Sequence, residues 1–138
     1  MLEIKNLSVS IENKKIINNL SFKIDKGKKV AIMGPNGSGK STLSNIIAGK
    51  DGFDINNGEI LFNKKNLLEL EPEKRAAEGI FLAFQYPVEI PGIANSSFLR
   101  TAINSIRKFN GKQDVNTRDF LEECKRVAKK LDLDNSFL

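Results

Sequence analysis

The amino-acid sequence predicts an α/β protein in which a β-rich first half is followed by a mostly helical second half. Three observations support this fold class. The segments LEIKNLSVSI (2–11) and LSFKI (20–24) alternate apolar and polar residues, as half-exposed strands do. The segments VAIM (30–33) and IFLAFQ (80–85) are short continuous apolar runs, which are typical of strands buried on both faces. The segments beyond residue 92 show helical periodicity instead.

Turn and cap residues predict the remaining elements of the first half. The polar turn ENKK (12–15) joins the first two strands. A helix begins near Lys40 and ends at Gly49, which is a suitable C-cap. The segment NNGEILFN (56–63) predicts a turn followed by a strand. The segment PEKRAAEG (72–79) predicts a short helix with proline at its first position.

The second half begins with a break in regular structure. The segment YPVEIPG (86–92) contains two prolines and a glycine, which interrupt helices and strands. Two helices are then predicted over SSFLRTAINSIRKF (96–109) and TRDFLEECKRVAKKL (117–131). The polar segment NGKQDVN (110–116) separates them as a loop.

Length and composition are those of a globular domain. A chain of 138 residues can bury one ordinary core. Its 40% of hydrophobic and 28% of charged residues exclude a disordered chain and a disulfide-rich miniprotein. No apolar run approaches the roughly 20 residues of a membrane helix, and the N-terminus has no signal-peptide pattern. We therefore expect no direct membrane insertion and a cytoplasmic location, or a plastid-type organelle if the source is eukaryotic.

The reactive residue types exclude several kinds of site. The sequence has no histidine, so it contains no Ser-His-Asp or Cys-His catalytic set and no Cys/His zinc set. Its one cysteine cannot form an internal disulfide. The net charge of +5 comes from scattered lysine pairs with carboxylates between them. This pattern indicates a solvated surface, and we expect no nucleic-acid partner.

The segment GPNGSGKS (34–41) matches the pattern G-x-x-x-x-G-K-[ST] in full. Glycines at positions 34, 37 and 39 allow positive φ, so that consecutive N–H groups can point inward around an anion. The helix that begins near Lys40 adds the positive end of its dipole. A buried strand before the loop and a helix after it are the context that this motif requires. A glycine-rich turn with a chance lysine is the alternative, and this context disfavours it.

The loop therefore predicts a site for a nucleoside triphosphate. Lys40 supplies a mobile charge for the β- and γ-phosphates, and the Ser41 hydroxyl is suited to coordinate Mg²⁺. Side chains other than these would obstruct a ligand held by main-chain N–H groups. The predicted binding residues of the loop are Gly34, Pro35, Asn36, Gly37, Ser38, Gly39, Lys40, Ser41 and Thr42.

The sequence GPNGSGKSTL (34–43), preceded by the two predicted strands, resembles the ABC (ATP-binding cassette) ATPases. The segment AAEGIFLAFQYPVEIPGIANSSFLRTA (76–102) resembles the SufC family, the soluble ABC ATPases of the SUF iron–sulfur cluster assembly system. The resemblance extends over essentially the whole chain. Its most specific pieces are AIMGPNGSGKSTLSNIIAG (31–49) and FQYPVEIPG (84–92).

This resemblance implies a P-loop NTPase core of the ABC ATPase type, with an antiparallel β-subdomain and the start of a helical subdomain. Residues 1–92 would form the β-subdomain, the P-loop core and the glutamine loop, or Q-loop. Residues 93–138 would begin the helical subdomain. The implied cofactors are ATP and Mg²⁺.

The resemblance also implies two site residues outside the P-loop. Gln85 occupies the Q-loop position, where its amide would ligate Mg²⁺ together with Ser41 or orient the attacking water. Gln85 and Lys40 are thus the expected catalytic residues, and the alternative for Gln85 is a polar residue at a strand end. Ile11 stands where the family commonly has an aromatic residue stacked on adenine. An aliphatic side chain can still pack on the base, without the stacking contribution.

Partners follow from the same resemblance. SufB- and SufD-type scaffold proteins would bind the region from Gln85 to Leu99, and the full-length protein would form an ATP-dependent homodimer. Hydrolysis in the family requires an apolar run ending in Asp-Glu, an LSGGE-type signature and a switch histidine, none of which this sequence contains. We therefore expect the N-terminal part of a longer, truncated ABC ATPase that is inactive by itself.

Three other functions remain open from the sequence. The chain could be the ATP-binding cassette of a membrane transporter, in which Gln85 to Leu99 would dock a permease. It could be a nucleotide-binding or regulatory module without hydrolysis of its own. A P-loop kinase or GTPase is a further alternative, but it leaves the Q-loop match and the two-strand lead-in unexplained.

Overall fold

The computed structural model describes residues 1–86 and 89–134. The chain forms two compact units, Met1–Ala83 and Phe84–Leu138. The functional division of the chain at residue 92 stays a prediction.

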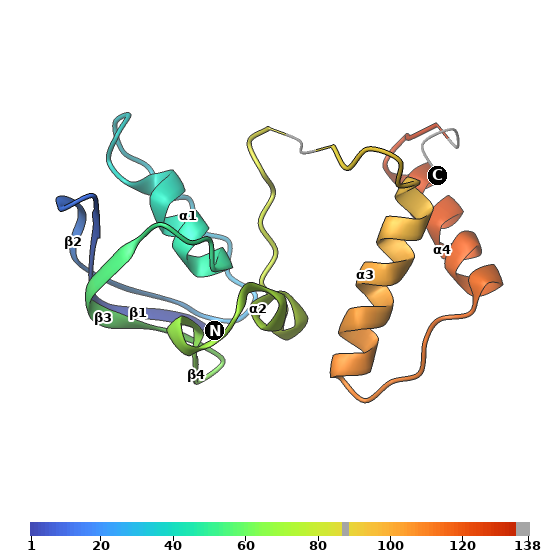
Figure 1. Ribbon diagram of the computed structural model, residues 1–138, viewed down its shortest axis with the longest axis horizontal. Helices are drawn as coiled ribbons and strands as arrows, with labels where there is room; N and C mark the ends of the chain where they lie inside the picture. Colours follow the sequence, from blue (N-terminus) through green and yellow to red (C-terminus); the bar gives the residue numbers. More distant parts are fainter. Residues whose placement is uncertain (87–88, 135–138) are drawn as a thin grey trace. The chain divides into compact units, whose positions relative to one another are not determined.

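An antiparallel sheet is the framework of the first unit (Figure 1). Strands β1 and β2 confirm the expected pair of half-exposed strands, but β2 begins at Lys14, six residues before the predicted strand, so the turn is shorter than the predicted 12–15. Ile11 pairs with Lys14 across this turn. The strand order is β2-β1-β3-β4. The bounds are Leu2–Ile11 for β1, Lys14–Ile24 for β2, Asp54–Phe62 for β3 and Lys65–Asn66 for β4.

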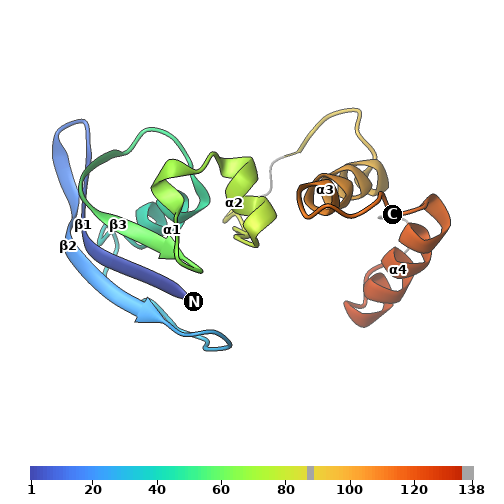
Figure 2. The same ribbon diagram turned by 90° about the horizontal axis from the view of Figure 1, so that it is seen from below.

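Bulges bend this sheet around its helix. Asn6 in β1 and Asn19 in β2 have positive φ angles of 50° and 49°, and the strand register shifts along β1. The displaced amides are satisfied by serines, since Asn6 N donates to Ser21 Oγ at 2.8 Å and Asn19 N donates to Ser8 Oγ at 3.1 Å. Bulges strengthen the local twist of a sheet. The strands accordingly curve around helix α1, Lys40–Ala48 (Figure 2).

The core of the first unit lies between α1 and the sheet. Leu43 and Ile46 of α1 are buried against strand residues, because apolar positions three residues apart lie on one face of a helix. Gly49 is the C-cap of α1, as the sequence predicts, with a φ angle of 91°. The buried strand residues of this core are Ile4, Leu7, Val9, Ile17 and Ile60.

Helix α2, Pro72–Glu78, comes after β3 and β4 along the chain and confirms the predicted helix. Proline stands in its first turn and Gly79 ends it with φ of 109°. The sequence analysis missed β4 and the 3₁₀ helix η1, Leu67–Glu69, that precede α2. Both elements are too short to give a periodic signal.

Three local predictions were wrong. The runs 30–33 and 80–85 form no strand, and Met33 and Phe81 are 88% and 91% exposed. A strand needs a hydrogen-bonded neighbour, and no strand among the described residues pairs with either run. The segment 56–58 forms no turn but lies inside β3. Gly58 has φ of 97° there and faces the bulge of β1, so its glycine marks a bulge and not a chain reversal.

The second unit contains both predicted helices, α3 (Asn95–Phe109) and α4 (Thr117–Lys130). Asn116 caps α4 by accepting a hydrogen bond from Asp119 N at 2.8 Å. Apolar residues of both helices line a cavity of about 400 Å³, among them Ile103 and Phe120. The described residues of 86–92 contain no helix or strand, as expected, while 87–88 lie outside the described residues.

Candidate functional site

The loop over residues 34–39 leads into α1, and its backbone has the conformation that the motif predicts. Gly37 and Gly39 have φ angles of 79° and 90°, which side-chain-bearing residues rarely adopt. Gly34 is different, because its φ is ordinary and a side chain there would meet only the side chain of Ser38. A Cβ at Gly34 would lie 2.7 Å from Ser38 Oγ. The loop is therefore bare of side chains where main-chain groups must approach a ligand.

The N-terminal end of α1 is open to an anion. Helix geometry leaves the first N–H groups without intrahelical partners. Among the described residues, no backbone hydrogen bond satisfies the amides of Lys40, Ser41 and Thr42, whereas Leu43 N donates to Gly39 O at 2.9 Å. The first turn contains no acidic residue. The positive end of the helix dipole therefore faces the loop without a neutralising carboxylate.

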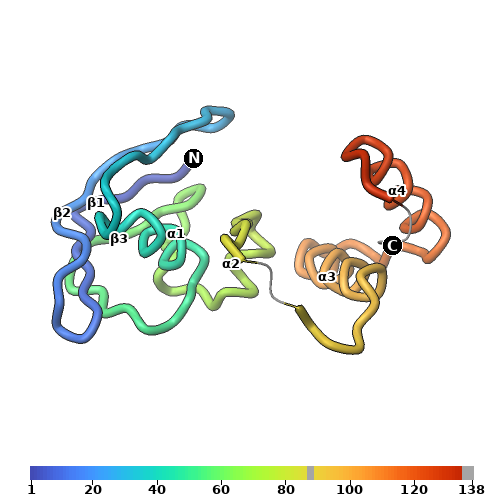
Figure 3. The backbone as a smooth tube through the Cα atoms, turned by 90° about the horizontal axis from the view of Figure 1, so that it is seen from above, coloured from blue at the N-terminus to red at the C-terminus, as the bar shows by residue number. Residues whose placement is uncertain are grey.

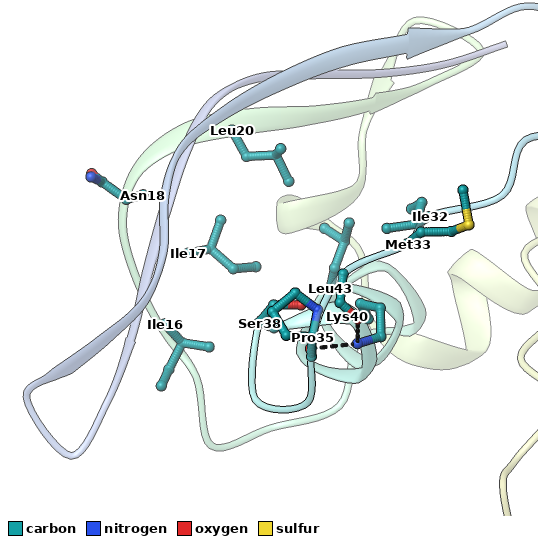
Figure 4. Close-up of a pocket in the computed structure, with 12 residues that line it drawn as sticks. Ile16, Ile17, Asn18, Leu20, Ile32, Met33, Pro35, Ser38, Lys40 and Leu43 are labelled. Atoms are coloured by element: carbon teal, nitrogen blue, oxygen red, sulfur yellow. Dashed lines mark hydrogen bonds between the residues drawn. The ribbon is translucent and has the colours of Figure 1, made fainter.

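Lys40 turns back over the loop. Its Nζ donates to the carbonyl oxygen of Gly34 at 2.7 Å and to that of Pro35 at 2.8 Å (Figure 4). The ammonium group thus lies beside the backbone that would surround a phosphate. Ser41 is exposed and Thr42 is half-buried one and two positions further along the helix. The structure brings all the predicted P-loop residues together in one loop and helix turn.

A cavity of about 400 Å³ lies between this loop and strand β2. Figure 4 shows Ile17 and Leu20 pointing from β2 toward the loop, while Asn18 points away. Ile16 and Ile17 also contact the start of α1, since a Cβ at Gly39 would stand 3.4 Å from a side-chain carbon of each. The sequence analysis missed these wall residues. The predicted hairpin after residue 11 was the available signal, because it places β2 beside β1, and residues of β2 line the cavity next to the loop.

The two predicted site residues outside the loop are placed differently. Ile11 ends β1, is half-buried and is not among the residues that line the cavity. Gln85 is exposed and belongs to the second unit. The roles of Ile11 on the base and of Gln85 at the metal stay predictions.

The curved sheet, the glycine-rich loop and the helix behind it define an α/β NTPase core of the P-loop class. A family model described as ABC transporter matches residues 17–136, and the chain belongs to this family. Within the part of the chain that the structure describes, no helix combines the length and apolar character needed to cross a bilayer.

The curated relatives of this chain carry related names. It is 52% identical over 120 residues, 87% of the chain and 48% of the relative, to "Probable ATP-dependent transporter SufC" of Escherichia coli (strain K12). It is 48% identical over its whole length, and over 55% of the relative, to "Probable ATP-dependent transporter ycf16" of Antithamnion sp.. A third relative, "Probable ATP-dependent transporter slr0075" of Synechocystis sp., is 47% identical over 96% of the chain and 51% of its own length. The chain spans about half the length of these relatives.

Solved structures agree on the fold. A nucleotide-free ATP-binding cassette from an ABC transporter superposes with a TM-score of 0.70 at 27% identity, covering 96% of this chain and 54% of that one. The cassette MJ0796, solved as a dimer in a post-hydrolysis state with ADP and Pi, gives 0.69 at 22% identity, covering 99% and 60%. The expected fold class, a P-loop NTPase core of the ABC ATPase type, is thus confirmed.

Proposed function

We propose that this chain is the ATP-binding part of an ABC ATPase that powers iron–sulfur cluster assembly. The observation that carries this proposal is the loop before α1, where a bare backbone, an uncompensated helix end and Lys40 converge. The identity of about half to a relative named SufC supports the finer assignment.

Phosphate binding follows from the chemistry of the loop. Main-chain N–H groups and the end of α1 provide donors that need no side chain. Lys40 exchanges its two carbonyl contacts for the β- and γ-phosphates, because a charged oxygen is the stronger acceptor for an ammonium group. The apolar wall formed by Ile16 and Ile17 offers a surface for the less polar part of the nucleotide.

The same turn fits a magnesium ion held jointly with the nucleotide. Ser41 presents a hydroxyl one position beyond Lys40, and hydroxyl and phosphate oxygens are ligands that Mg²⁺ accepts. Ser41 and Gln85 are the residues that would hold the ion. When bound, Mg²⁺ neutralises charge on the β- and γ-phosphates.

A binding measurement on the chain tests this proposal. We expect the wild-type chain to bind MgATP in calorimetry, and Lys40→Ala to weaken that binding by at least about tenfold, since a charge-assisted contact is lost. Lys50→Ala is the matched control, because Lys50 is an exposed lysine just past the other end of α1. Equal affinities of the wild-type chain and Lys40→Ala would refute the proposed site.

The proposed partners are SufB- and SufD-type scaffold proteins, bound through the region from Gln85 to Leu99. In the whole protein two copies would assemble around ATP, in the cytoplasm or an equivalent compartment. Several described apolar side chains of this region are exposed, including Tyr86, Ile90 and Phe98. Affinity capture with purified SufB or SufD homologues tests the partners, and capture of a permease domain instead would contradict this assignment.

The second candidate function is the cassette of a membrane transporter. The names of the relatives favour it, because three of them are called probable ATP-dependent transporters. Both candidates use the same phosphate site. They differ in the partner that contacts the region from Gln85 to Leu99, so the capture experiment separates them.

A further inference from the structure

Arg75 is a buried charged residue that the proposed phosphate chemistry does not use. The residue is 7% exposed, and Ser8 is the other polar residue that is buried among the described ones. Burial lowers the pKa of its guanidinium from the ordinary value, while Glu71 acts in the opposite direction. A charge in such surroundings needs good hydrogen-bond partners.

Backbone carbonyls provide those partners, and they come from two helical segments. Arg75 Nη1 donates to Ile46 O at 2.7 Å and to Ile47 O at 3.4 Å, at the end of α1. Its Nε donates to Leu70 O at 2.7 Å, just before α2. One planar guanidinium therefore ties the C-terminal end of α1 to the start of α2. Strands β3 and β4 and the 3₁₀ helix η1 lie between α1 and α2 along the chain, as the colours of the tube in Figure 3 show, so this tie joins segments that are distant in sequence.

The end of α1 is suited to receive this cation. The last carbonyls of a helix lack intrahelical partners and carry the negative end of its dipole. The last turn of α1 contains no basic residue of its own. Arg75 supplies from α2 the positive charge that α1 lacks.

Gly49 makes the close approach possible. A Cβ at this position would lie 3.1 Å from Arg75 Nε and 3.2 Å from the Cα of Pro72. The chain at the end of α1 is therefore shaped around both the guanidinium and the first turn of α2. This fit indicates a specific junction between the two helices.

The opposite end of α1 forms the phosphate cradle. At that end Gly39 lies against Ile16 and Ile17 of β2, and in the middle Leu43 and Ile46 fill the core. A helix of nine residues is a rod of about 13 Å. Loss of the anchor at one end of such a rod would let it tilt about its core contacts and would move the N–H groups at the other end.

We propose that Arg75 is a positioning residue for nucleotide binding. It holds the C-terminal end of α1 and thereby determines the position of the phosphate-binding turn at Lys40. This inference rests on the proposed ATP-binding function. It extends that function to a residue that contacts no nucleotide and lies outside the P-loop.

The test compares MgATP affinity among four chains, each shown to be folded by circular dichroism at the temperature used. Arg75→Met keeps the apolar volume and removes the donors, and we expect it to raise the Kd for MgATP by about tenfold. Arg75→Lys keeps the charge but cannot place two nitrogens on Leu70 and Ile46 at once, and we expect a smaller rise. Lys74→Met, on the exposed side of α2, is the matched control and should bind as the wild-type chain does.

Affinity separates positioning from a merely structural role, because the Kd of an already folded chain does not change when only the folding equilibrium changes. A folded Arg75→Met chain that binds MgATP as tightly as the wild type would overturn the proposal. If Arg75→Met does not fold, wild-type affinity in folded Arg75→Lys overturns it instead. A wild-type chain that binds no MgATP would refute the proposed function itself, and this inference with it.

Discussion

Gly34 and Ser38 lie close together in the loop before α1, since a methyl group at Gly34 would stand 2.7 Å from Ser38 Oγ unless that hydroxyl rotated away. Ser38 N in turn donates to Pro35 O at 3.2 Å, which closes the loop into a tight turn. The shape of the loop therefore involves a close approach between Gly34, which the motif specifies, and Ser38, where the motif allows any residue.

This relationship predicts that a second substitution rescues the first. Gly34→Ala should weaken MgATP binding by less than about tenfold, or about 1.4 kcal/mol, because the Ser38 hydroxyl must rotate away from the methyl group. Ser38→Ala alone should bind close to wild type. The double variant should regain most of the lost affinity, because the hydroxyl that the methyl group meets is gone. Calorimetry on the three variants checks this, and a double variant as weak as Gly34→Ala would contradict it.

The bulge at Gly58 predicts a large stability effect away from the site. Gly58→Ala should lower the free energy of unfolding by about 3 kcal/mol or more, because strain at positive φ is added to overlap with backbone. Its Cβ would lie 2.5 Å from Lys5 O and 2.6 Å from Leu7 Cα. Gly52→Ala is the matched control, with φ of 92° and nothing within 4 Å, and should cost about 1 kcal/mol. Urea unfolding measures both, and equal losses would show that the overlap is unimportant.

The thiol of Cys124 should react slowly. It is half-buried, and burial together with the charge of Glu123 raises its pKa above the ordinary value. A raised pKa leaves less of the reactive thiolate at pH 8, and the rate should climb as the pH rises toward the shifted pKa. Iodoacetamide labelling followed by mass spectrometry checks this with a single cysteine. The chain unfolded in urea is the control, and equal rates in both states would contradict the prediction.

The 138-residue chain should bind ATP without turning it over. Its sequence contains no histidine, no SGG triplet and no apolar run ending in Asp. Phosphate release should therefore be the same for the wild-type chain and for Lys40→Ala. A malachite-green assay with excess MgATP measures this, and turnover that Lys40→Ala abolishes would show that the chain carries a complete catalytic set.

The candidate site was largely predictable because its signal is local. The positive φ angles of Gly37 and Gly39 and the place of Lys40 at the start of α1 belong to the local chain, so a spacing in the sequence predicts them. The wall of the cavity was not predictable in the same way. Ile16 and Ile17 look like any strand residues until pairing with β1 brings them to Gly39.

The two apolar runs show the limit of periodicity. VAIM and IFLAFQ have the composition of buried strands, yet Met33 and Phe81 are almost fully exposed. Composition reports what a segment prefers to contact, whereas a strand exists only when a neighbour accepts its hydrogen bonds. The bulge at Gly58 was misread as a turn for a related reason, because glycine signals positive φ without saying whether the chain then reverses.

Sequence by itself determined helices α1 to α4, the first two strands, the glycine-rich loop and the family to which the chain belongs. These features depend mostly on residues a few positions apart, because the spacing of residues along a helix, strand or turn fixes how they lie in space. Only the tertiary structure decided which strand lines the cavity beside the loop, how close Gly34 lies to Ser38 Oγ, and that Arg75 ties the end of α1 to α2. Contacts between residues 29 positions apart, such as Arg75 with Ile46, leave no pattern in one sequence, since they arise from packing of the whole unit.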